Sequence, residues 1–203
     1  PNECIQLVMS LPNVGSILGN HDATVLWDSA PYMMTKHAKE VILWTMDKLG
    51  EKERKYLRSL PLTHRFNNIN FSHANPKDPE GWGYINNRKN AVRSCKHCKD
   101  KVIFVGHTHQ PLMATRQNYF QMNFVLPPIN KPILIDSSRQ QIFNCGSIGQ
   151  PRTGSPELNY LIFDTRKNSI IYYAVPYDFD LASQKIMDNG LPPRLAQRLK
   201  TGV

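Results

Sequence analysis

The sequence has no apolar run long enough to cross a membrane. A membrane helix needs about 18 consecutive apolar residues, whereas even the apolar segment Val41–Trp44 lies between Glu40 and Asp47. We therefore expect no membrane-spanning segment and no membrane partner. The chain begins at Pro1, so the lack of a recognisable signal peptide carries little weight for localisation.

Cysteine is also scarce. The chain of 203 residues contains only Cys4, Cys95, Cys98 and Cys145, which are too few for a disulfide framework. This scarcity favours a reducing compartment, and we expect a cytoplasmic protein. Cys95 and Cys98 have the spacing of half a zinc site, but no second pair completes it. A structural role is therefore the simpler interpretation of the pair.

Acidic residues are outnumbered by basic ones. Lys and Arg total 25 against 16 Asp and Glu, so the formal net charge is +9. Such a balance suits an anionic ligand, such as a phosphate ester or a nucleic acid. The densest basic run extends from Arg88 to Lys101, with only Asp100 opposing it. It could follow a nucleic-acid backbone, but a solvated helix face is the simpler interpretation, so a nucleic-acid partner stays open without being favoured.

The length and a hydrophobic content of 40% suffice for the core of one domain. No repeat or composition break marks a second domain, so we expect one domain over residues 1–203. Hydrophobic periodicity and β-branched runs indicate the elements. We expect helices over residues 1–11, 34–49, 51–60 and 181–199, the last broken at Gly190, and strands over residues 14–18, 68–72, 101–106, 112–116, 119–125, 133–136, 141–146, 160–164 and 169–175. Their order indicates two sheets packed face to face with helices outside.

Polar residues follow three of the expected strands. Gly19–Asp22 follows the strand over 14–18, His73 follows the strand over 68–72, and His107–His109 follows the strand over 101–106. Ligands of α/β sheets gather beyond the carboxyl ends of strands. A single histidine there means little, but two histidines separated by one residue on an extended segment point the same way and can address one metal or two neighbouring metals. The coincidence of all three segments predicts a metal site.

Four segments, in this order and at these intervals, are similar to the later motifs of the calcineurin-like metallophosphoesterases of the small prokaryotic type. They are Gly19–Asp22 (GNHD), Ser72–Ala74 (SHA), Gly106–Pro111 (GHTHQP) and Asn144–Arg152 (NCGSIGQPR). The resemblance covers essentially the whole chain. It implies an α/β fold, a four-layer α/β/β/α sandwich of two mixed β-sheets, and a dinuclear metal site that hydrolyses phosphate esters.

The resemblance also implies the metal ligands. Asn20, His73 and His107 would bind the second metal, and His109 would bind the first. The cofactors would be two divalent transition-metal ions, Mn, Fe, Zn or Ni, with Mn favoured. Two such cations about 3.5–4 Å apart stabilise phosphoryl oxygens and turn bound water into a hydroxide nucleophile near neutral pH.

The same resemblance places other residues beside the substrate. His21 would contact the phosphate or donate a proton, and Asp22 would orient His21. Trp82 and Tyr84 lie in a segment that resembles the family's loop beside the cleft, and Arg152 is the last residue of the last motif, so these side chains are candidates for substrate contact. Packing is an equal competitor for all three. We expect a small phosphate-ester or nucleotide substrate, either a phosphomonoester or a phosphodiester.

The carboxylate motifs of the family, Asp-x-His and Gly-Asp, belong upstream of Asn20, yet residues 1–19 contain no Asp. Two neighbouring dications without anionic ligands would repel each other strongly. We therefore expect a domain that lacks its N-terminal strands, and a chain that is inactive or impaired by itself.

The alternative is a non-catalytic scaffold that binds proteins, although such a scaffold has no chemical need for the histidine set. A homo-oligomer also stays open, because the apolar, Pro-rich segment Tyr119–Pro132 could meet another subunit.

Overall fold

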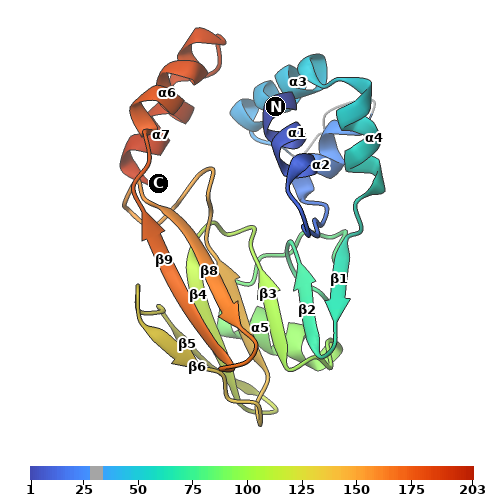
Figure 1. The fold of residues 1–203 in the computed structure, drawn as a ribbon, viewed down its shortest axis with the longest axis vertical. Coiled ribbons are helices and arrows are strands. Elements are labelled where there is room, and N and C mark those ends of the chain that lie inside the picture. The colour runs from blue at the N-terminus through green and yellow to red at the C-terminus, as the bar shows by residue number, and fades with distance from the viewer. Residues whose placement is uncertain (28–33) are drawn as a thin grey trace. The chain divides into compact units, whose positions relative to one another are not determined.

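Four helices make up the first part of the chain in the computed structural model, which describes residues 1–27 and 34–203 (Figure 1). They are α1 (Asn2–Ser10), α2 (Asn20–Val25), α3 (Lys36–Lys48) and α4 (Glu51–Ser59). The contacts between residues divide the chain into two units, Pro1–Leu62 and Thr63–Val203. The helices expected over residues 1–11, 34–49 and 51–60 are confirmed, whereas the single domain over residues 1–203 stays a prediction.

The strand expected over residues 14–18 is wrong, because these residues have no regular secondary structure. A strand needs a neighbour to complete its hydrogen bonds, and the described part of the first unit contains no strand. The Leu18 N–H donates instead to the Pro61 carbonyl at 2.8 Å. The apolar run leads into α2, which the sequence did not predict and which buries its second half, Ala23–Val25.

The first unit has its own small core. Val25 of α2, Ile42 of α3 and Leu57 of α4 pack together with Leu49, which ends α3. The Thr35 hydroxyl caps α3 by accepting a hydrogen bond from the Ala38 N–H at 3.3 Å, as expected for a Thr at this position. The core therefore holds α2, α3 and α4 in one body.

The second unit contains two sheets. The larger has the order β1-β2-β3-β7-β4-β5, in which β2, β3 and β7 run parallel and the remaining pairs are antiparallel. The smaller has the order β6-β9-β8 and is antiparallel in the described residues, although both sheets were expected to be mixed. The strands are β1 (Thr63–Phe66), β2 (Ile69–Ser72), β3 (Val102–Val105), β4 (Pro111–Asn118), β5 (Gln121–Val125), β6 (Pro132–Leu134), β7 (Gln141–Cys145), β8 (Leu158–Asp164) and β9 (Ser169–Val175).

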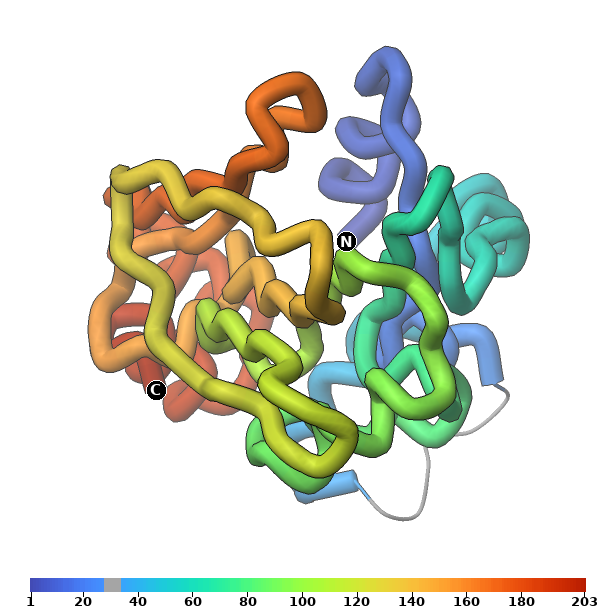
Figure 2. The backbone as a smooth tube through the Cα atoms, turned by 90° about the horizontal axis from the view of Figure 1, so that it is seen from below, coloured from blue at the N-terminus to red at the C-terminus, as the bar shows by residue number. Residues whose placement is uncertain are grey.

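All the strands expected from residue 68 onward are confirmed, and only β1 was not predicted. Three of the four residues of β1 are exposed, so its sequence lacks the apolar alternation that marks a half-buried strand. In Figure 2 the chain from β4 through β5 to β6, coloured yellow-green to yellow, passes from the larger sheet to the smaller one.

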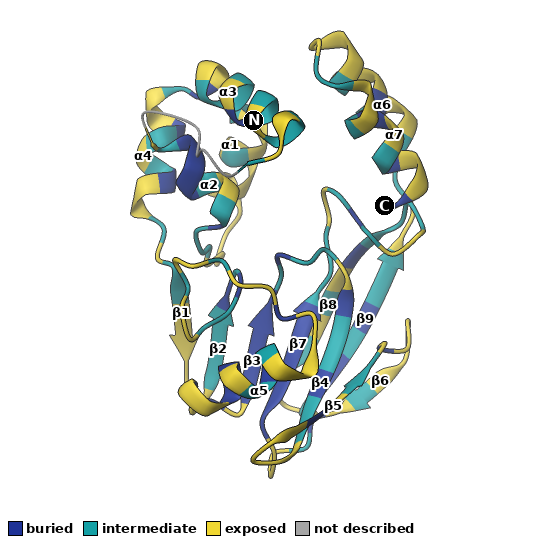
Figure 3. Ribbon diagram, turned by 180° about the vertical axis from the view of Figure 1, so that it is seen from behind, coloured by how far each residue is buried: buried dark blue, intermediate teal, exposed yellow. Residues whose placement is uncertain are grey.

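The two faces of the larger sheet carry different cores. On one face, Ile103 and Val105 of β3 pack against α5 (Arg88–His97). On the other face, Val102 and Phe104 pack with residues of the smaller sheet. This alternation is the period of two expected of a strand that is buried on both sides, and the dark blue β3 and β7 in Figure 3 show the result. Helix α5, the larger sheet and the smaller sheet thus form successive layers.

Two helices follow β9, namely α6 (Phe179–Asp188) and α7 (Pro193–Thr201). They confirm the helix expected over residues 181–199 with its break at Gly190, which adopts a φ of +65°. The Ser183 hydroxyl of α6 donates to the Ala196 carbonyl of α7 at 3.0 Å. No helix in the described ranges is long and apolar enough to cross a membrane.

Candidate metal centre

Three neighbouring parallel strands end at one edge of the larger sheet. His73 directly follows β2, His107 lies two residues after β3, and Asn144 is near the end of β7. The Gly106 N–H donates to the His73 carbonyl at 3.0 Å, so the ends of β2 and β3 are bonded to each other. Side chains at such an edge converge on one crevice. His73 and His107 therefore lie beside each other, and their binding of a metal stays a prediction.

The imidazoles of His73 and His107 face each other through ring nitrogens. His73 Nε2 and His107 Nδ1 lie 3.1 Å apart. Two nitrogens that each lie about 2.0–2.1 Å from one ion, with about 90–110° between them, are separated by roughly 2.9–3.4 Å. The observed separation matches this range. The two nitrogens form a hydrogen bond at this distance, and the same separation fits two adjacent ligand positions of a single cation.

The backbone of the turn after β3 is strained. His107 has a φ of 65° and His109 a φ of 62°, in the left-handed region that residues with a Cβ rarely occupy. Each such residue costs about 1–3 kcal/mol, and such residues cluster at functional sites. The two histidines were expected on an extended segment. That geometry is wrong, because the Thr108 N–H donates back to the Gly106 carbonyl at 2.7 Å and closes a tight turn.

Asn144 holds this turn in place. Its Nδ2 donates to the Gly106 carbonyl at 2.6 Å and to Thr108 Oγ1 at 2.9 Å, while its Oδ1 accepts from the Gly146 N–H at 3.0 Å. The side chain is 1% exposed. Sequence reasoning quoted Asn144 within a motif but gave it no role. The pattern that could have revealed this role is a polar amide near the end of a buried strand, two residues before a glycine.

The glycine after this strand is required by two constraints. Gly146 has a φ of +79°, and a Cβ at this position would lie 2.6 Å from the Cβ of Asn159. Burial raises the pKa of the thiol of the neighbouring Cys145 to about 12, so this thiol is neutral and is not a nucleophile.

His109 is held by the segment that follows β7. Its Nδ1 donates to the Gln150 carbonyl at 2.8 Å, and its own carbonyl accepts from the Arg152 N–H at 3.1 Å. Because a carbonyl only accepts, the Nδ1 carries the proton and Nε2 is the nitrogen suited to bind a cation. The contact thus sets the tautomer that a metal ligand needs.

Two aromatic rings pack on the histidine pair. The Tyr84 ring stacks on the His107 imidazole with centroids 4.2 Å apart and an interplanar angle of 13°, and the Trp82 ring meets the His73 ring edge-on at 5.9 Å. Tyr84 is still 45% exposed. Both rings therefore orient the imidazoles, and Tyr84 also keeps a surface that a bound molecule can touch.

A cavity of about 630 Å³ opens beside the strained turn. Thr108, which lies between the two histidines, and Arg152 are among its lining residues, and Ile85, Leu112 and Ile129 form an apolar part of its wall. The Nε of Arg152 is buried and has no hydrogen-bond partner among the described atoms. A cationic donor of this kind suits the oxygen of a phosphate group.

The predicted residues of the first unit lie in the first turn of α2. Asp22 Oδ2 accepts from the Gly19 N–H at 2.9 Å, and the Thr24 hydroxyl donates to the Asn20 carbonyl at 2.7 Å. Burial raises the pKa of the Asp22 carboxyl, while the Gly19 N–H and the charge of His21 oppose this rise. Asp22 therefore caps the helix, and His21 next to it is exposed.

Within residues 1–27 and 34–203, no three His, Cys, Asp or Glu side chains gather closely enough to form a metal site by themselves. The structure brings together His73 and His107 of the predicted ligands.

Comparison with known proteins identifies the family. Residues 2–168 match the family described as the calcineurin-like phosphoesterase superfamily domain, and the chain belongs to this family. It is similar to the uncharacterised protein MJ0912 of Methanocaldococcus jannaschii, with 36% identity over 206 residues that cover 100% of this chain and 81% of that protein.

Solved structures agree with this assignment. The crystal structure of a metallophosphoesterase from Sphaerobacter thermophilus matches with a TM-score of 0.87 and 29% identity, covering 99% of this chain and 82% of that one. The hypothetical protein PH1004 from Pyrococcus horikoshii matches with a TM-score of 0.74 and 21% identity, covering 100% and 78%, and it supports the fold alone. The chain has the calcineurin-like fold.

Proposed function

We propose that this chain carries most of a dinuclear metal site and that the protein hydrolyses a phosphate ester, mono- or diester, by metal-activated water. One observation carries the proposal. His73 Nε2 and His107 Nδ1 lie 3.1 Å apart beyond neighbouring parallel strands, on a backbone that Asn144 holds in a strained turn, in a chain of the phosphoesterase family.

His73, His107 and Asn20 would hold the second cation, and His109 would hold the first through Nε2. When bound, the two cations withdraw charge from the phosphoryl oxygens and lower the pKa of water. Imidazole suits Zn, Fe and Ni, whereas Mn prefers oxygen ligands. Mn, which the family resemblance favours, therefore depends most on carboxylates, and residues 1–19 contain no Asp. We propose that the 203-residue chain alone is inactive or impaired.

The side chains around the metals have separate tasks. His21 contacts the phosphate or donates a proton to the leaving oxygen, and Asp22 orients His21. Arg152, which lines the cavity, binds a phosphoryl oxygen through its guanidinium, and Tyr84 contacts the organic group. The substrate is a small phosphate ester or a nucleotide, whose apolar part lies against Ile85 and the neighbouring wall of the cavity. The cytoplasmic location and a homo-oligomeric state stay predictions.

The test is the number of transition-metal ions per chain, with the intact mass of the same sample, for the complete gene product and for the 203-residue chain. We expect two ions and hydrolysis of p-nitrophenyl phosphate or its bis ester in the complete product, and fewer ions with little or no hydrolysis in the 203-residue chain. Metal binding without hydrolysis of either ester or of nucleotides would instead favour the protein-binding scaffold.

A further inference from the structure

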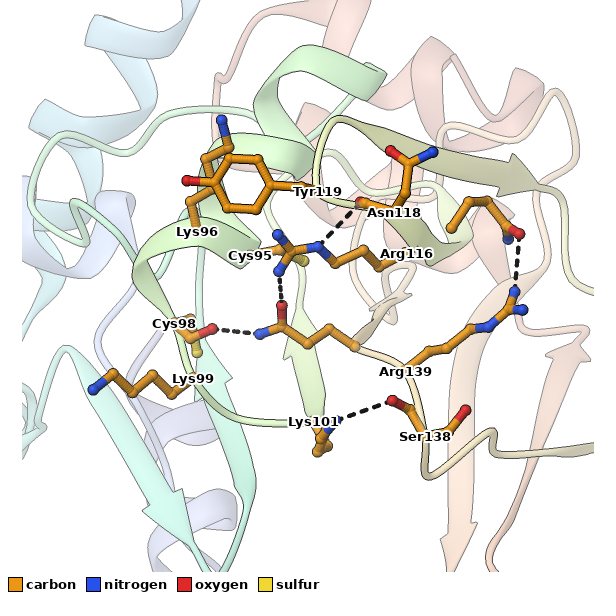
Figure 4. Close-up of a pocket in the computed structure, with 12 residues that line it drawn as sticks. Cys95, Lys96, Cys98, Lys99, Lys101, Arg116, Asn118, Tyr119, Ser138 and Arg139 are labelled. Atoms are coloured by element: carbon orange, nitrogen blue, oxygen red, sulfur yellow. Dashed lines mark hydrogen bonds between the residues drawn. The ribbon is translucent and has the colours of Figure 1, made fainter.

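A second cavity, of about 530 Å³, lies at the opposite end of the larger sheet from the histidines. Lys101 directly precedes β3 and Gln140 directly precedes β7, whereas the histidines follow the other ends of β2 and β3. The cavity is within the range of about 300–1,000 Å³ that is usual for small-molecule sites. Its lining residues lie within three segments, 95–101, 116–119 and 138–140 (Figure 4). We call it the basic pocket.

Positive charge dominates the basic pocket. Five of its lining residues are cationic, namely Lys96, Lys99, Lys101, Arg116 and Arg139, and no carboxylate lines it. Arg139 forms an ion pair with Asp136, whose Oδ2 lies 3.2 Å from the Arg139 Nε. In the described part of the chain, the other four cations have no ion pair. A concave surface with uncompensated charge concentrates anions.

The nearest buried carboxylate is already satisfied from the other side. The Asp100 side chain is 5% exposed, and its Oδ1 lies 2.6 Å from the Arg65 Nη2. The Cys98 thiol donates to the second oxygen, Oδ2, at 3.4 Å. The negative charge of Asp100 is therefore offset by Arg65, which does not line the pocket.

Arg116 is held in a fixed position on the pocket wall. Its Nη1 donates to Gln140 Oε1, and its Nε donates to the Asn118 carbonyl at 3.2 Å. Gln140 is itself buried, at 9% exposure, and its Nε2 donates to the carbonyls of Cys98 and Asp100 at 2.5 and 3.2 Å. In Figure 4, dashed lines mark the contact between Arg116 and Asn118 and the contact that Cys98 accepts. A guanidinium fixed in this way binds oxyanions such as phosphate well, because little freedom is lost on binding.

The two cysteines do not reduce the positive charge. Burial raises the pKa of both thiols, Cys95 and Cys98, to about 11. Both are therefore neutral at physiological pH and poor metal ligands. This agrees with the structural role expected for the pair, and it leaves the lysines and arginines as the charged groups of the pocket.

We propose that the basic pocket binds a small molecule that carries two or more phosphate groups. The four cations without an ion pair match the charge of such a ligand, and the fixed fork of Arg116 matches a phosphate oxygen pair. The basic run of the sequence does not act as one stripe. Lys96, Lys99 and Lys101 line the pocket, while Arg88 and Lys89 do not. Cations that surround a hollow favour a compact polyanion over an extended nucleic-acid backbone, which needs a continuous track of charge.

The probe is inorganic tripolyphosphate, titrated calorimetrically into EDTA-treated and desalted protein at about 0.15 M salt, where weak surface attraction is screened. We expect one molecule bound per chain, and the same affinity in His107→Ala. Arg116→Gln should weaken binding about 10-fold or more, because it removes charge-assisted hydrogen bonds. Lys131→Gln is the matched control, since Lys131 is exposed and lies outside the pocket, and it should bind as the parent does.

Each other outcome decides against the proposal. No binding of tripolyphosphate overturns it, as does binding that is lost in His107→Ala and kept in Arg116→Gln, which would place the anion at the metal site. If a single-stranded oligonucleotide binds with steep salt dependence and tripolyphosphate does not bind, the basic run from Arg88 to Lys101 is a nucleic-acid site instead. If Arg116→Gln fails to fold, the Lys96→Gln and Lys99→Gln double variant replaces it, because both lysines are exposed. Unchanged affinity in this folded double variant overturns the proposal.

Discussion

The two ends of the larger sheet are built for opposite chemistry. The end with His73 and His107 offers ring nitrogens with lone pairs, which require a cation. The end with Arg116 and its neighbouring lysines offers positive charge, which requires an anion. At the first end, the geometry is imposed by the backbone, because His107 and His109 have positive φ values. None of the lining residues of the basic pocket has a positive φ.

This difference shows two ways of fixing a side chain. A metal ligand must be positioned within a fraction of an ångström, so strain in the backbone and a buried amide, Asn144, hold the turn. An anion site tolerates longer side chains, and one buried amide, Gln140, suffices to hold the guanidinium of Arg116. Substitutions that affect one end and leave the other unchanged therefore test whether the two sites are separate.

The largest effect is expected from His107→Ala. Loss of a hydrogen-bond partner of a metal ligand lowers metal affinity or activity by about 10–100-fold. Loss of the ligand itself should therefore lower the turnover of the complete gene product by more than about 100-fold and lower its metal content. Tripolyphosphate binding should be unchanged. The matched control is His97→Ala, because His97 is exposed near the end of α5. Full hydrolysis in His107→Ala contradicts the assignment of the metal site.

A smaller effect is expected from Asn144→Leu. This substitution leaves the Gly106 carbonyl without its side-chain donor and releases the turn, so the free energy of unfolding should fall by about 1–3 kcal/mol. Metal affinity should fall about 10–100-fold, as measured by competition with a chelating dye. A structural role alone would lower stability and leave metal affinity intact, and that result would remove Asn144 from the metal centre.

Gln140→Leu should affect only the other end. It frees the guanidinium of Arg116 without removing its charge, so tripolyphosphate affinity should fall by about 3–10-fold, a loss in the range of one hydrogen bond. Metal content should equal that of the parent protein. Stability is measured in parallel by urea denaturation, since Gln140 is buried. Equal losses of metal and tripolyphosphate would show that the two ends are not separate.

The effect that is smallest at neutral pH concerns the thiols of the basic pocket. Burial raises the pKa of Cys95 and Cys98 from 9.0 to about 11. Above pH 9 the unfolded chain therefore releases these protons before the folded chain does, and stability falls as pH rises, by up to about 1.4 kcal/mol per pH unit for each thiol. Urea denaturation between pH 8 and pH 10 measures the slope. The Cys95→Ala and Cys98→Ala double variant should show a shallower slope, and an unchanged slope contradicts the burial of both thiols.

Local sequence determined the elements and the family. The helices α3 and α4 and the strands β2 and β3 follow from periodicity, β-branched residues and the breaks at Gly50 and Pro61, because these preferences act over a few residues. The histidines at the strand ends were predicted for a similar reason. The direction of a strand determines which residues emerge at its carboxyl end.

Tertiary structure decided the rest, because it depends on contacts between distant segments. Residues 14–18 form no strand since no neighbouring strand pairs with them, and β1 exists because β2 does. The positive φ of His107 depends on Asn144, which is 37 residues away in numbering. The basic run became part of a pocket only when Arg116 of β4 and Gln140, which directly precedes β7, were brought to it. Composition and periodicity describe each segment alone, and convergence of segments is a property of the folded chain.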